Sequence, residues 1–171
     1  MARRAQTETA VLGALSVEPM TGYAVRAAIT TTLGHFWSES FGQIYPTLDR
    51  LSADGLVVHG ADKRFTITDA GLTRLRELLC EPIEPAPARN GLLLRLFFGR
   101  MLGRDVCIQL LEEARSSSER SLETMAAIRA GVESETGSPD QPFFLVTIAA
   151  GEAGARAQIE WATESMELLR R

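Results

Sequence analysis

Residues 40–51 read Ser40-Phe41-Gly42-Gln43-Ile44-Tyr45-Pro46-Thr47-Leu48-Asp49-Arg50-Leu51. Ile44, Leu48 and Leu51 follow one another at the i, i+4, i+7 spacing of a helix that buries one face. Proline has no backbone N–H and is tolerated near a helix start, so Pro46 places that start close by, near residues 42–43. The stretch therefore predicts a short helix with one apolar stripe.

The opposite face of this helix carries side chains that can contact a DNA duplex. We predict that it presents Gln43, Tyr45, Thr47 and Arg50, with Ser40 beside them at the helix start. Glutamine pairs with adenine edges, threonine can bond a base or touch a thymine methyl, and arginine can reach phosphate or guanine. A solvated face with a half-buried tyrosine is the alternative interpretation.

Two helices are predicted before this segment and one after it. The first covers residues 9–17, and the second begins at Thr21, a favourable N-cap residue. The helix of the opening segment ends before Gly55, because glycine is typical of the position that follows a helix. The fourth helix begins at Thr68 or Asp69.

A small hairpin is predicted between the third and fourth helices. Residues 56–59 and 64–67 have the composition of two short strands, and the turn between them brings Lys63 and Arg64 to the tip. Three helices followed by a two-stranded wing make a winged helix-turn-helix, in which the third helix can enter the major groove. The wing cations would then lie beside the phosphate backbone.

A proline-rich stretch divides the chain. Residues 81–90 include three closely spaced prolines and predict an extended linker between a winged-helix domain at 1–80 and a helical domain at 91–171. The net charge is −4, and residues 1–80 carry eight of the 18 basic and eight of the 22 acidic residues. The excess negative charge therefore lies beyond the linker. A uniformly basic DNA-binding coat is excluded, but a local positive face is not.

The last predicted helix has the clearest pattern of the second half. Its apolar residues form a seam at three- and four-residue steps: Ile148, Ala155, Ile159, Ala162, Met166 and Leu169. We predict that this seam pairs with a second subunit, and an intramolecular bundle is the alternative. Phe97, Phe98 and Trp161 are candidates to line an effector pocket, although aromatic residues at helical spacing are common in plain cores.

The sequence carries no signal for catalysis, metal binding or membrane insertion. His35 and His59 lie in separate elements without a cysteine or carboxylate at metal-ligand spacing. There is no glycine-rich phosphate loop and no nucleophile motif around a serine. No run approaches the roughly 20 apolar residues that span a bilayer. We therefore expect a cytoplasmic, non-enzymatic protein with no metal and no cofactor.

Six short motifs follow one another between residues 9 and 71. They are Val11-Leu12-Gly13-Ala14-Leu15, Pro19-Met20-Thr21-Gly22-Tyr23, Phe36-Trp37-Ser38, Gly42-Gln43-Ile44-Tyr45-Pro46-Thr47-Leu48, Gly55-Leu56-Val57 and Phe65-Thr66-Ile67-Thr68-Asp69-Ala70-Gly71. In this order they resemble the DNA-binding domain of the PadR family of transcriptional regulators. The second half, with Leu93-Leu94-Arg95-Leu96-Phe97-Phe98-Gly99 and Trp161 in the last helix, is similar to the longer PadR subfamily.

The resemblance implies a dimeric DNA-binding repressor whose C-terminal helices pair two subunits and which responds to small aromatic or drug-like compounds. It implies DNA contacts for the third helix, the start of the second helix and the wing, namely Gln43, Tyr45 and Thr47, Tyr23, and Lys63 and Arg64. We therefore predict a ligand-responsive regulator that binds a near-palindromic operator as a homodimer. A winged-helix protein-interaction adaptor without specific DNA binding is the alternative.

Overall fold

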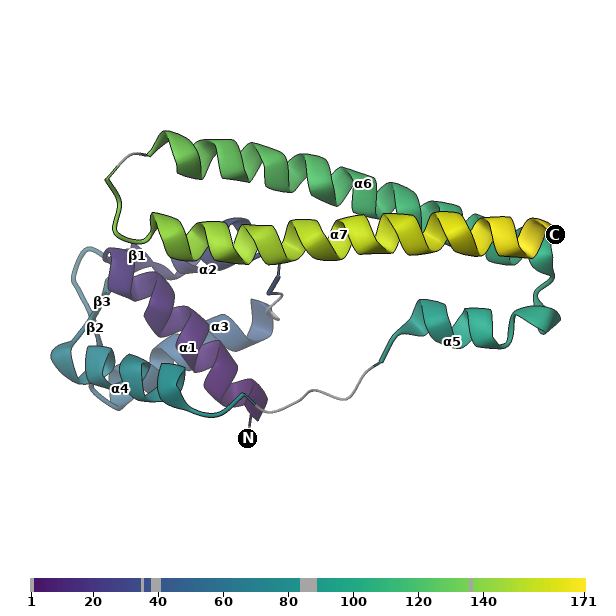
Figure 1. The fold of residues 1–171 in the computed structure, drawn as a ribbon. Helices are drawn as coiled ribbons and strands as arrows, with labels where there is room; N and C mark the ends of the chain where they lie inside the picture. The colour runs from purple at the N-terminus through teal and green to yellow at the C-terminus, as the bar shows by residue number, and fades with distance from the viewer. Residues whose placement is uncertain (1, 35, 38–40, 84–88, 136) are drawn as a thin grey trace. The chain divides into compact units, whose positions relative to one another are not determined.

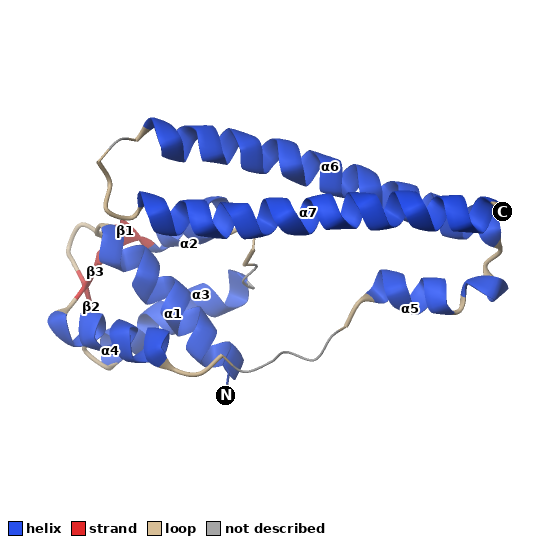
Figure 2. Cartoon of the chain, viewed as in Figure 1, coloured by secondary structure: helices blue, strands red, loops and turns tan. Residues whose placement is uncertain are grey.

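The computed structural model describes residues 2–34, 36–37, 41–83, 89–135 and 137–171 (Figure 1). The chain divides into two compact units, Met1–Ala86 and Pro87–Arg171. The first unit contains α1 (Ala2–Val17), β1 (Met20–Thr21), α2 (Gly22–Thr32), α3 (Phe41–Ala53), β2 (Val57–His59), β3 (Arg64–Ile67) and α4 (Asp69–Cys80). The second contains α5 (Gly91–Phe97), the short 3₁₀ helix η1 (Gly99–Met101), α6 (Arg104–Ser134) and α7 (Gln141–Arg170). Both units are mainly helical, and the strands of the described residues all lie in the first (Figure 2).

Three residues were predicted to mark helix ends in the first unit, and each of them does. The Thr21 hydroxyl accepts a hydrogen bond from the backbone N–H of Ala24 at 3.2 Å, which caps α2. The Thr68 hydroxyl accepts one from Gly71 at 3.1 Å and caps α4, which decides between the two candidate residues. Gly55 follows α3 with φ at 72°, in the left-handed region that favours glycine. The predicted boundaries of α2, α3 and α4 are confirmed at these points.

The predicted wing is present, with one more strand than expected. β2 and β3 pair antiparallel, with Val57 opposite Ile67 and His59 opposite Phe65. The two-residue strand β1 adds to the other edge of β3, where Met20 lies opposite Phe65, so the strand order is β1-β3-β2. The two-stranded wing is thus confirmed, and β1 is an additional strand that was not predicted, because a strand of two residues has no alternation that a sequence pattern could reveal.

The first helix is longer than predicted. It begins at Ala2, whereas the apolar pattern indicated a start near Thr9. The added residues include alanine, arginine and glutamine, which favour helix but add no large apolar residue to the pattern. The extension brings Glu8 into the body of the helix, on a side that is buried.

A single apolar core holds the first unit together. Its buried residues come from α1, α2, α3, the hairpin and α4, and they are Val11, Leu12, Leu15, Val25, Ile29, Ile44, Leu48, Leu51, Val57, Phe65, Leu75 and Leu78. The predicted stripe of Ile44, Leu48 and Leu51 is at most 1% exposed. Because α1 and α2 both pack on α3, one face of α3 is fixed and the other is turned to solvent.

The second unit is built on two long antiparallel helices, α6 and α7, which lie side by side (Figure 1). The Gln141 side-chain amide donates to the carbonyl oxygens of Val132 at 2.8 Å and Glu135 at 3.2 Å, so the first residue of α7 caps the end of α6. The short helix α5 is capped by Asn90, whose Oδ1 accepts from the N–H groups of Leu92 and Leu93 at 3.0 Å. No residue of α5 is buried.

Candidate nucleic-acid interface

The solvent-facing side of α3 presents two of the predicted DNA-contacting residues. Gln43 is exposed, and Tyr45 is 48% exposed. Because α3 begins at Phe41, Pro46 is its sixth residue and removes the hydrogen bond that would reach the carbonyl of Gly42. Gly42 is exposed, so water can satisfy this carbonyl. The proline therefore lies further inside the helix than predicted, at a point where its cost is low.

Tyr45 is positioned by the start of α2. A Cβ atom on Gly22 would lie 2.6 Å from Cε1 of Tyr45, so the tyrosine ring rests directly on the glycine. Tyr23, the next residue of α2, is 71% exposed. The structure thus brings the second and third helices together at Gly22 and leaves Tyr23, Gln43 and Tyr45 accessible. We refer to these three residues as the reading patch.

The prediction that Thr47 faces outward is wrong, because Thr47 is only 6% exposed. Successive residues of a helix are about 100° apart, so Thr47 lies about 60° from Ile44 and about 40° from Leu51. These angles place its side chain at the edge of the apolar stripe. In this structure Thr47 supports the packing of α3 and does not belong to its exposed face.

Arg50 is not free in this structure, and its contact with DNA stays a prediction. Its Nη2 lies 2.9 Å from Oε2 of Glu8 on α1, and its Nη1 lies 3.7 Å from Oδ2 of Asp54. Glu8 is 6% exposed and also accepts a hydrogen bond from Nε of Arg74 at 3.0 Å. This hydrogen bond is the main reason that the pKa of Arg74 is raised. Arg50 therefore anchors α3 to the core side of the unit.

Glu8 is the residue of this unit that the sequence analysis missed. It precedes Val11, Leu12 and Leu15 by three, four and seven residues, which places it on the apolar face of α1. A carboxylate on an apolar face indicates a buried charge that needs partners. That signal was present in the sequence, but the identity of the partners, Arg50 and Arg74, was not.

The wing carries two cations, Arg64 and Lys63, and only Arg64 has a side-chain partner among the residues that the structure describes. Arg64 donates from Nη1 to the carbonyl of Pro19 at 3.3 Å, and its Nε lies 3.8 Å from Oδ2 of Asp62. Lys63 has φ at 62° in the turn and makes no ion pair or hydrogen bond through its side chain with any residue that the structure describes. Lys63 is thus the wing residue best placed for a phosphate. Ser40 lies outside the described residues, and its role stays a prediction.

The predicted seam of α7 is buried within its own chain. Ile148, Ala155, Ala162 and Met166 are all at most 7% exposed, and α7 packs along α6. These four residues are covered by their own chain and are not available to contact a second subunit. The intramolecular alternative is therefore correct for them. Ile159 and Leu169 are partly exposed. Periodicity revealed that α7 has a partner helix, but it could not tell which chain supplies that partner.

The second unit has a cavity at the candidate effector residues. Its volume is about 720 Å³, and it is lined by residues of α5, η1, the start of α6 and the end of α7, including Phe97 and Trp161. Phe98 does not line it, is 58% exposed and packs edge-on against Phe97, with ring centroids 5.1 Å apart. The structure therefore brings two of the three candidate residues to one cavity.

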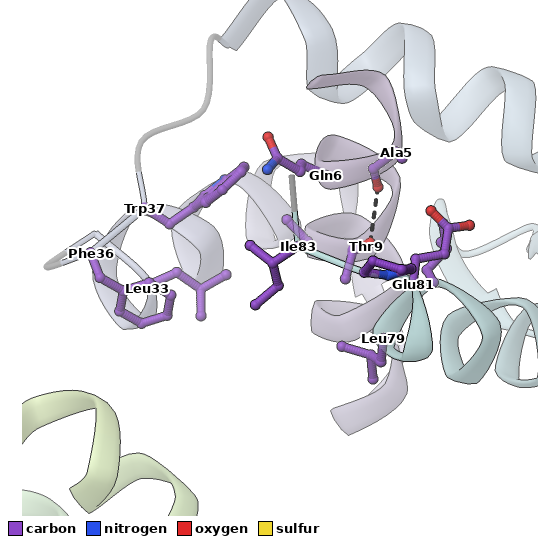
Figure 3. A pocket seen from close by; sticks show the side chains of 12 residues that line it. Ala5, Gln6, Thr9, Leu33, Phe36, Trp37, Leu79, Glu81 and Ile83 are labelled. Carbon is purple, nitrogen blue, oxygen red and sulfur yellow. Dashed lines mark hydrogen bonds between the residues drawn. The ribbon is translucent and has the colours of Figure 1, made fainter. Parts of the chain in front are cut away.

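Another cavity, of about 450 Å³, lies in the first unit between α1, the segment after α2 and the end of α4 (Figure 3). Leu33, Trp37, Leu79 and Ile83 are among its apolar walls. The indole N–H of Trp37 is buried and has no hydrogen-bond partner among the described residues. No residue of α3 lines this cavity, so it is separate from the reading patch.

The described ranges also bear on metal binding and membrane insertion. No group of three or more histidine, cysteine, aspartate or glutamate side chains is arranged there to hold a metal ion. In the same ranges no helix combines the length and the apolar character that crossing a lipid bilayer requires.

The three-helix core, the wing and the exposed face of α3 define the first unit as a winged helix-turn-helix of the DNA-binding type. Residues 11–77 match the transcriptional regulator PadR-like family, and residues 88–170 match the virulence activator alpha C-terminal family. Residues 11–77 therefore form a domain of the PadR-like family, whose members are transcriptional regulators and not enzymes.

Known regulators resemble this chain in sequence or in fold. The negative transcriptional regulator PadR of Bacillus subtilis is 28% identical over 123 residues, which cover 66% of this chain and 67% of that protein. The PadR-like regulator BC1756 of Bacillus cereus has the same fold, with a TM-score of 0.82 and 23% identity over 96% of this chain and 98% of its own. Bacillus subtilis PadR in complex with operator DNA gives a TM-score of 0.79 and 23% identity over 95% and 98%.

Proposed function

We propose that this chain is a ligand-responsive transcriptional repressor that binds a near-palindromic operator as a homodimer in the cytoplasm. Residues 1–80 would form the DNA-binding domain, 81–90 the linker, and 91–171 the dimerisation and effector domain. The observation that carries the proposal is the reading patch, in which Gln43 and Tyr45 project from α3, a helix whose opposite face is fixed in the core, and Tyr23 lies beside them on α2. It is supported by the solved complexes of Bacillus subtilis PadR with operator DNA and with p-coumaric acid.

The residues of the reading patch are suited to two kinds of DNA contact, to a base edge and to phosphates. Gln43 can form a bidentate pair with an adenine edge in the major groove, which discriminates between bases. Tyr23 and Tyr45 can donate their hydroxyl hydrogens to phosphate oxygens on either side, and Lys63 can pair with a phosphate beside the wing. A dimer would set two copies of α3 into successive major grooves about 34 Å apart.

Dimerisation needs a surface other than the buried seam of α7. The second unit exposes large apolar side chains on α5, on η1 and the residues that flank it, at the start of α6 and on the first turns of α7. They are Leu93, Leu94, Phe97, Phe98, Met101, Leu102, Val106, Phe143, Phe144 and Val146. Phe143 and Val146 are each 70% exposed and three residues apart on α7. A second copy that covers them removes this apolar surface from water, which favours association. Phe143→Ser with Val146→Ser is expected to shift sedimentation from dimer to monomer.

DNA titration with a matched pair of variants tests the repressor proposal. Gln43→Ala with Tyr45→Ala should lower affinity for the DNA upstream of this gene at least tenfold in a mobility-shift assay, because each good base contact contributes about 1–3 kcal/mol. Gln109→Ala, an exposed glutamine on α6, is the control and should bind as the unchanged protein does. Equal affinity for random duplex, or binding that does not weaken with salt, contradicts the proposal and favours a protein-interaction adaptor.

A further inference from the structure

Gly22 is a buried residue at the first position of α2, although Tyr23 beside it is 71% exposed. A Cβ atom built on Gly22 would lie 2.6 Å from Cε1, 3.3 Å from Cδ1 and 3.4 Å from Cζ of Tyr45. One edge of the tyrosine ring therefore occupies the space that a side chain at this position would fill. The ring is held at that edge, and Tyr45 as a whole remains 48% exposed.

The backbone of α2 does not need a glycine at this position. Its φ is not positive, unlike that of Gly55, Gly103 and Gly137. It lies in an α-helix, where alanine is favoured over glycine. An alanine in place of a glycine usually stabilises a protein where the backbone angles suit both residues. Because the three atoms nearest to the added Cβ all belong to Tyr45, the ring is the neighbour that requires a glycine here.

The backbone beneath the ring is held from two directions. The Thr21 hydroxyl accepts a hydrogen bond from the N–H of Ala24 at 3.2 Å, which ties it to α2. Thr21 also belongs to β1, where it lies opposite Arg64 of the central strand β3. Arg64 in turn donates from Nη1 to the carbonyl of Pro19 at 3.3 Å. We call residues 19–22 the ring seat, because the ring of Tyr45 rests on a segment that both α2 and the wing sheet hold in place.

We propose that Gly22 is a positioning residue for DNA recognition. Its missing side chain lets the ring seat hold Tyr45 in the orientation in which its hydroxyl meets a DNA phosphate. The inference rests on the proposed function, because the phosphate contact is part of operator binding. A methyl group at residue 22 would displace the ring. Since Tyr45 is half exposed, the ring can move without disturbing the core, so the fold survives and the contact with DNA is lost.

Gly22→Ala tests this separation of stability from binding. We expect the free energy of unfolding to stay the same or to rise, because alanine is the better helix former. Operator affinity should fall about tenfold, because a hydrogen bond to a charged group contributes about that factor. Gly91→Ala is the matched control. Gly91 is also the first residue of a helix behind a capping side chain, and a Cβ atom there meets nothing within 4 Å, so operator affinity should not change.

A double-mutant cycle with Tyr45→Ala tests whether Gly22 acts through the ring. The Tyr45→Ala background has no ring to displace, so the addition of Gly22→Ala should change operator affinity less than about twofold. An equal loss of affinity in both backgrounds would show that Gly22 acts independently of Tyr45, and it would overturn the proposal. A loss of stability in both backgrounds would show that the backbone itself needs the glycine, with the same consequence.

NMR of the tyrosine rings tests the ring seat without DNA. The sequence has two tyrosines, so Tyr23→Phe assigns the ring resonances of Tyr45. These resonances should shift in Gly22→Ala and stay in place in Gly91→Ala. Unchanged resonances in Gly22→Ala would show that the ring does not occupy the seat and would overturn the proposal. Shifted resonances with unchanged operator affinity would keep the seat and overturn its role in recognition.

Failure of the repressor proposal is distinguishable from failure of this one. If the unchanged protein binds no operator, the proposed function is lost, and the role of Gly22 in recognition is lost with it. The ring resonances still decide in that case whether Gly22 holds Tyr45 in place. If the unchanged protein binds the operator and Gly22→Ala binds it equally well, the repressor proposal stands and only the role of Gly22 is overturned.

Discussion

Each unit of this regulator buries one glutamate beside arginines, and the two clusters differ in what they join. Glu8 of α1 pairs with Arg50 of α3 at 2.9 Å and with Arg74 of α4 at 3.0 Å. Glu152 of α7 pairs with Arg129 of α6 at 2.8 Å. Both glutamates are nearly inaccessible, at 6% and 8% exposed. The same chemistry therefore connects three helices in one unit and two in the other.

Because the two clusters join different helices, we expect them to contribute differently to the positions of those helices. Glu152 joins helices that a long apolar seam already holds, and its second partner, Arg156, lies one turn along the same helix at 3.3 Å. A local pair of that kind contributes little. Glu8, by contrast, ties α3 to α1 through a residue of α3 itself, Arg50. We infer that the first cluster positions the reading patch and the second sets the register of a helix pair.

The largest effect is expected from removing the carboxylate of the first cluster. Glu8→Ala leaves Arg50 and Arg74 half-buried with only peripheral acidic partners, and we expect a loss of about 2 kcal/mol in the free energy of unfolding. Operator affinity should fall at least about fivefold at temperatures where the variant is folded, because α3 loses its anchor. Chemical denaturation and fluorescence anisotropy measure the two effects.

Two further variants sharpen this result. Glu113→Ala removes an exposed glutamate of α6 and should change neither quantity. Glu8→Gln keeps the shape of the side chain and one acceptor oxygen, so it should recover part of the stability. If Glu8→Ala lowers stability but leaves operator affinity unchanged in the folded protein, the cluster is structural only and does not position α3.

A smaller, pH-dependent effect is expected from the second cluster. The hydrogen bond from Arg129 lowers the pKa of Glu152 below its ordinary value of 4.5. Because the folded-state pKa is the lower one, this stabilisation is complete above the unfolded-state pKa and is lost as the pH falls through the folded-state value. The melting temperature of the unchanged protein should therefore drop more steeply below about pH 4.5 than that of Glu152→Gln. Glu113→Gln is the matched control, and an equally steep drop in Glu152→Gln would contradict the assignment.

These clusters also show what a sequence can and cannot predict. The stripe of Ile44, Leu48 and Leu51 and the caps at Thr21 and Thr68 were predictable, because each depends on residues close together in the chain. Glu8 was detectable as a polar residue on an apolar face, but its partners lie far along the chain and no local pattern names them.

The exposed face of α3 was predicted only in part. Gln43 and Tyr45 are exposed as expected, whereas Thr47 is buried and Arg50 is held by Glu8. The apolar stripe shows which side of a helix faces the core, but it does not show how far the buried surface extends around the helix. Thr47 lies at the edge of the stripe. Whether an edge residue is covered depends on the neighbouring helices, which the spacing within one helix does not specify.

The salt dependence of operator binding distinguishes a residue that holds α3 in place from a residue that contacts a phosphate. Each phosphate contact adds about 0.9 to the slope of log affinity against log salt concentration. Lys63→Gln should therefore reduce the slope by about 0.9 for each subunit bound. Arg50→Gln should weaken binding without changing the slope, because Arg50 already pairs with Glu8. Equal reductions of the slope in both variants would show that Arg50 leaves Glu8 and contacts DNA.

The smallest effect is expected at Thr47, where the inner and outer faces of α3 meet. Thr47→Val keeps the shape of a buried side chain and replaces its hydroxyl by a methyl group, so stability should change by about 1 kcal/mol or less. Operator affinity should stay within about twofold, because a residue that is 6% exposed cannot reach a base edge without rotation of the whole helix. Gln43→Ala, assayed in parallel, should lower affinity clearly. If Thr47→Val weakens binding as much as Gln43→Ala does, α3 must rotate on DNA, and the anchor at Glu8 would have to release Arg50 for that rotation to occur.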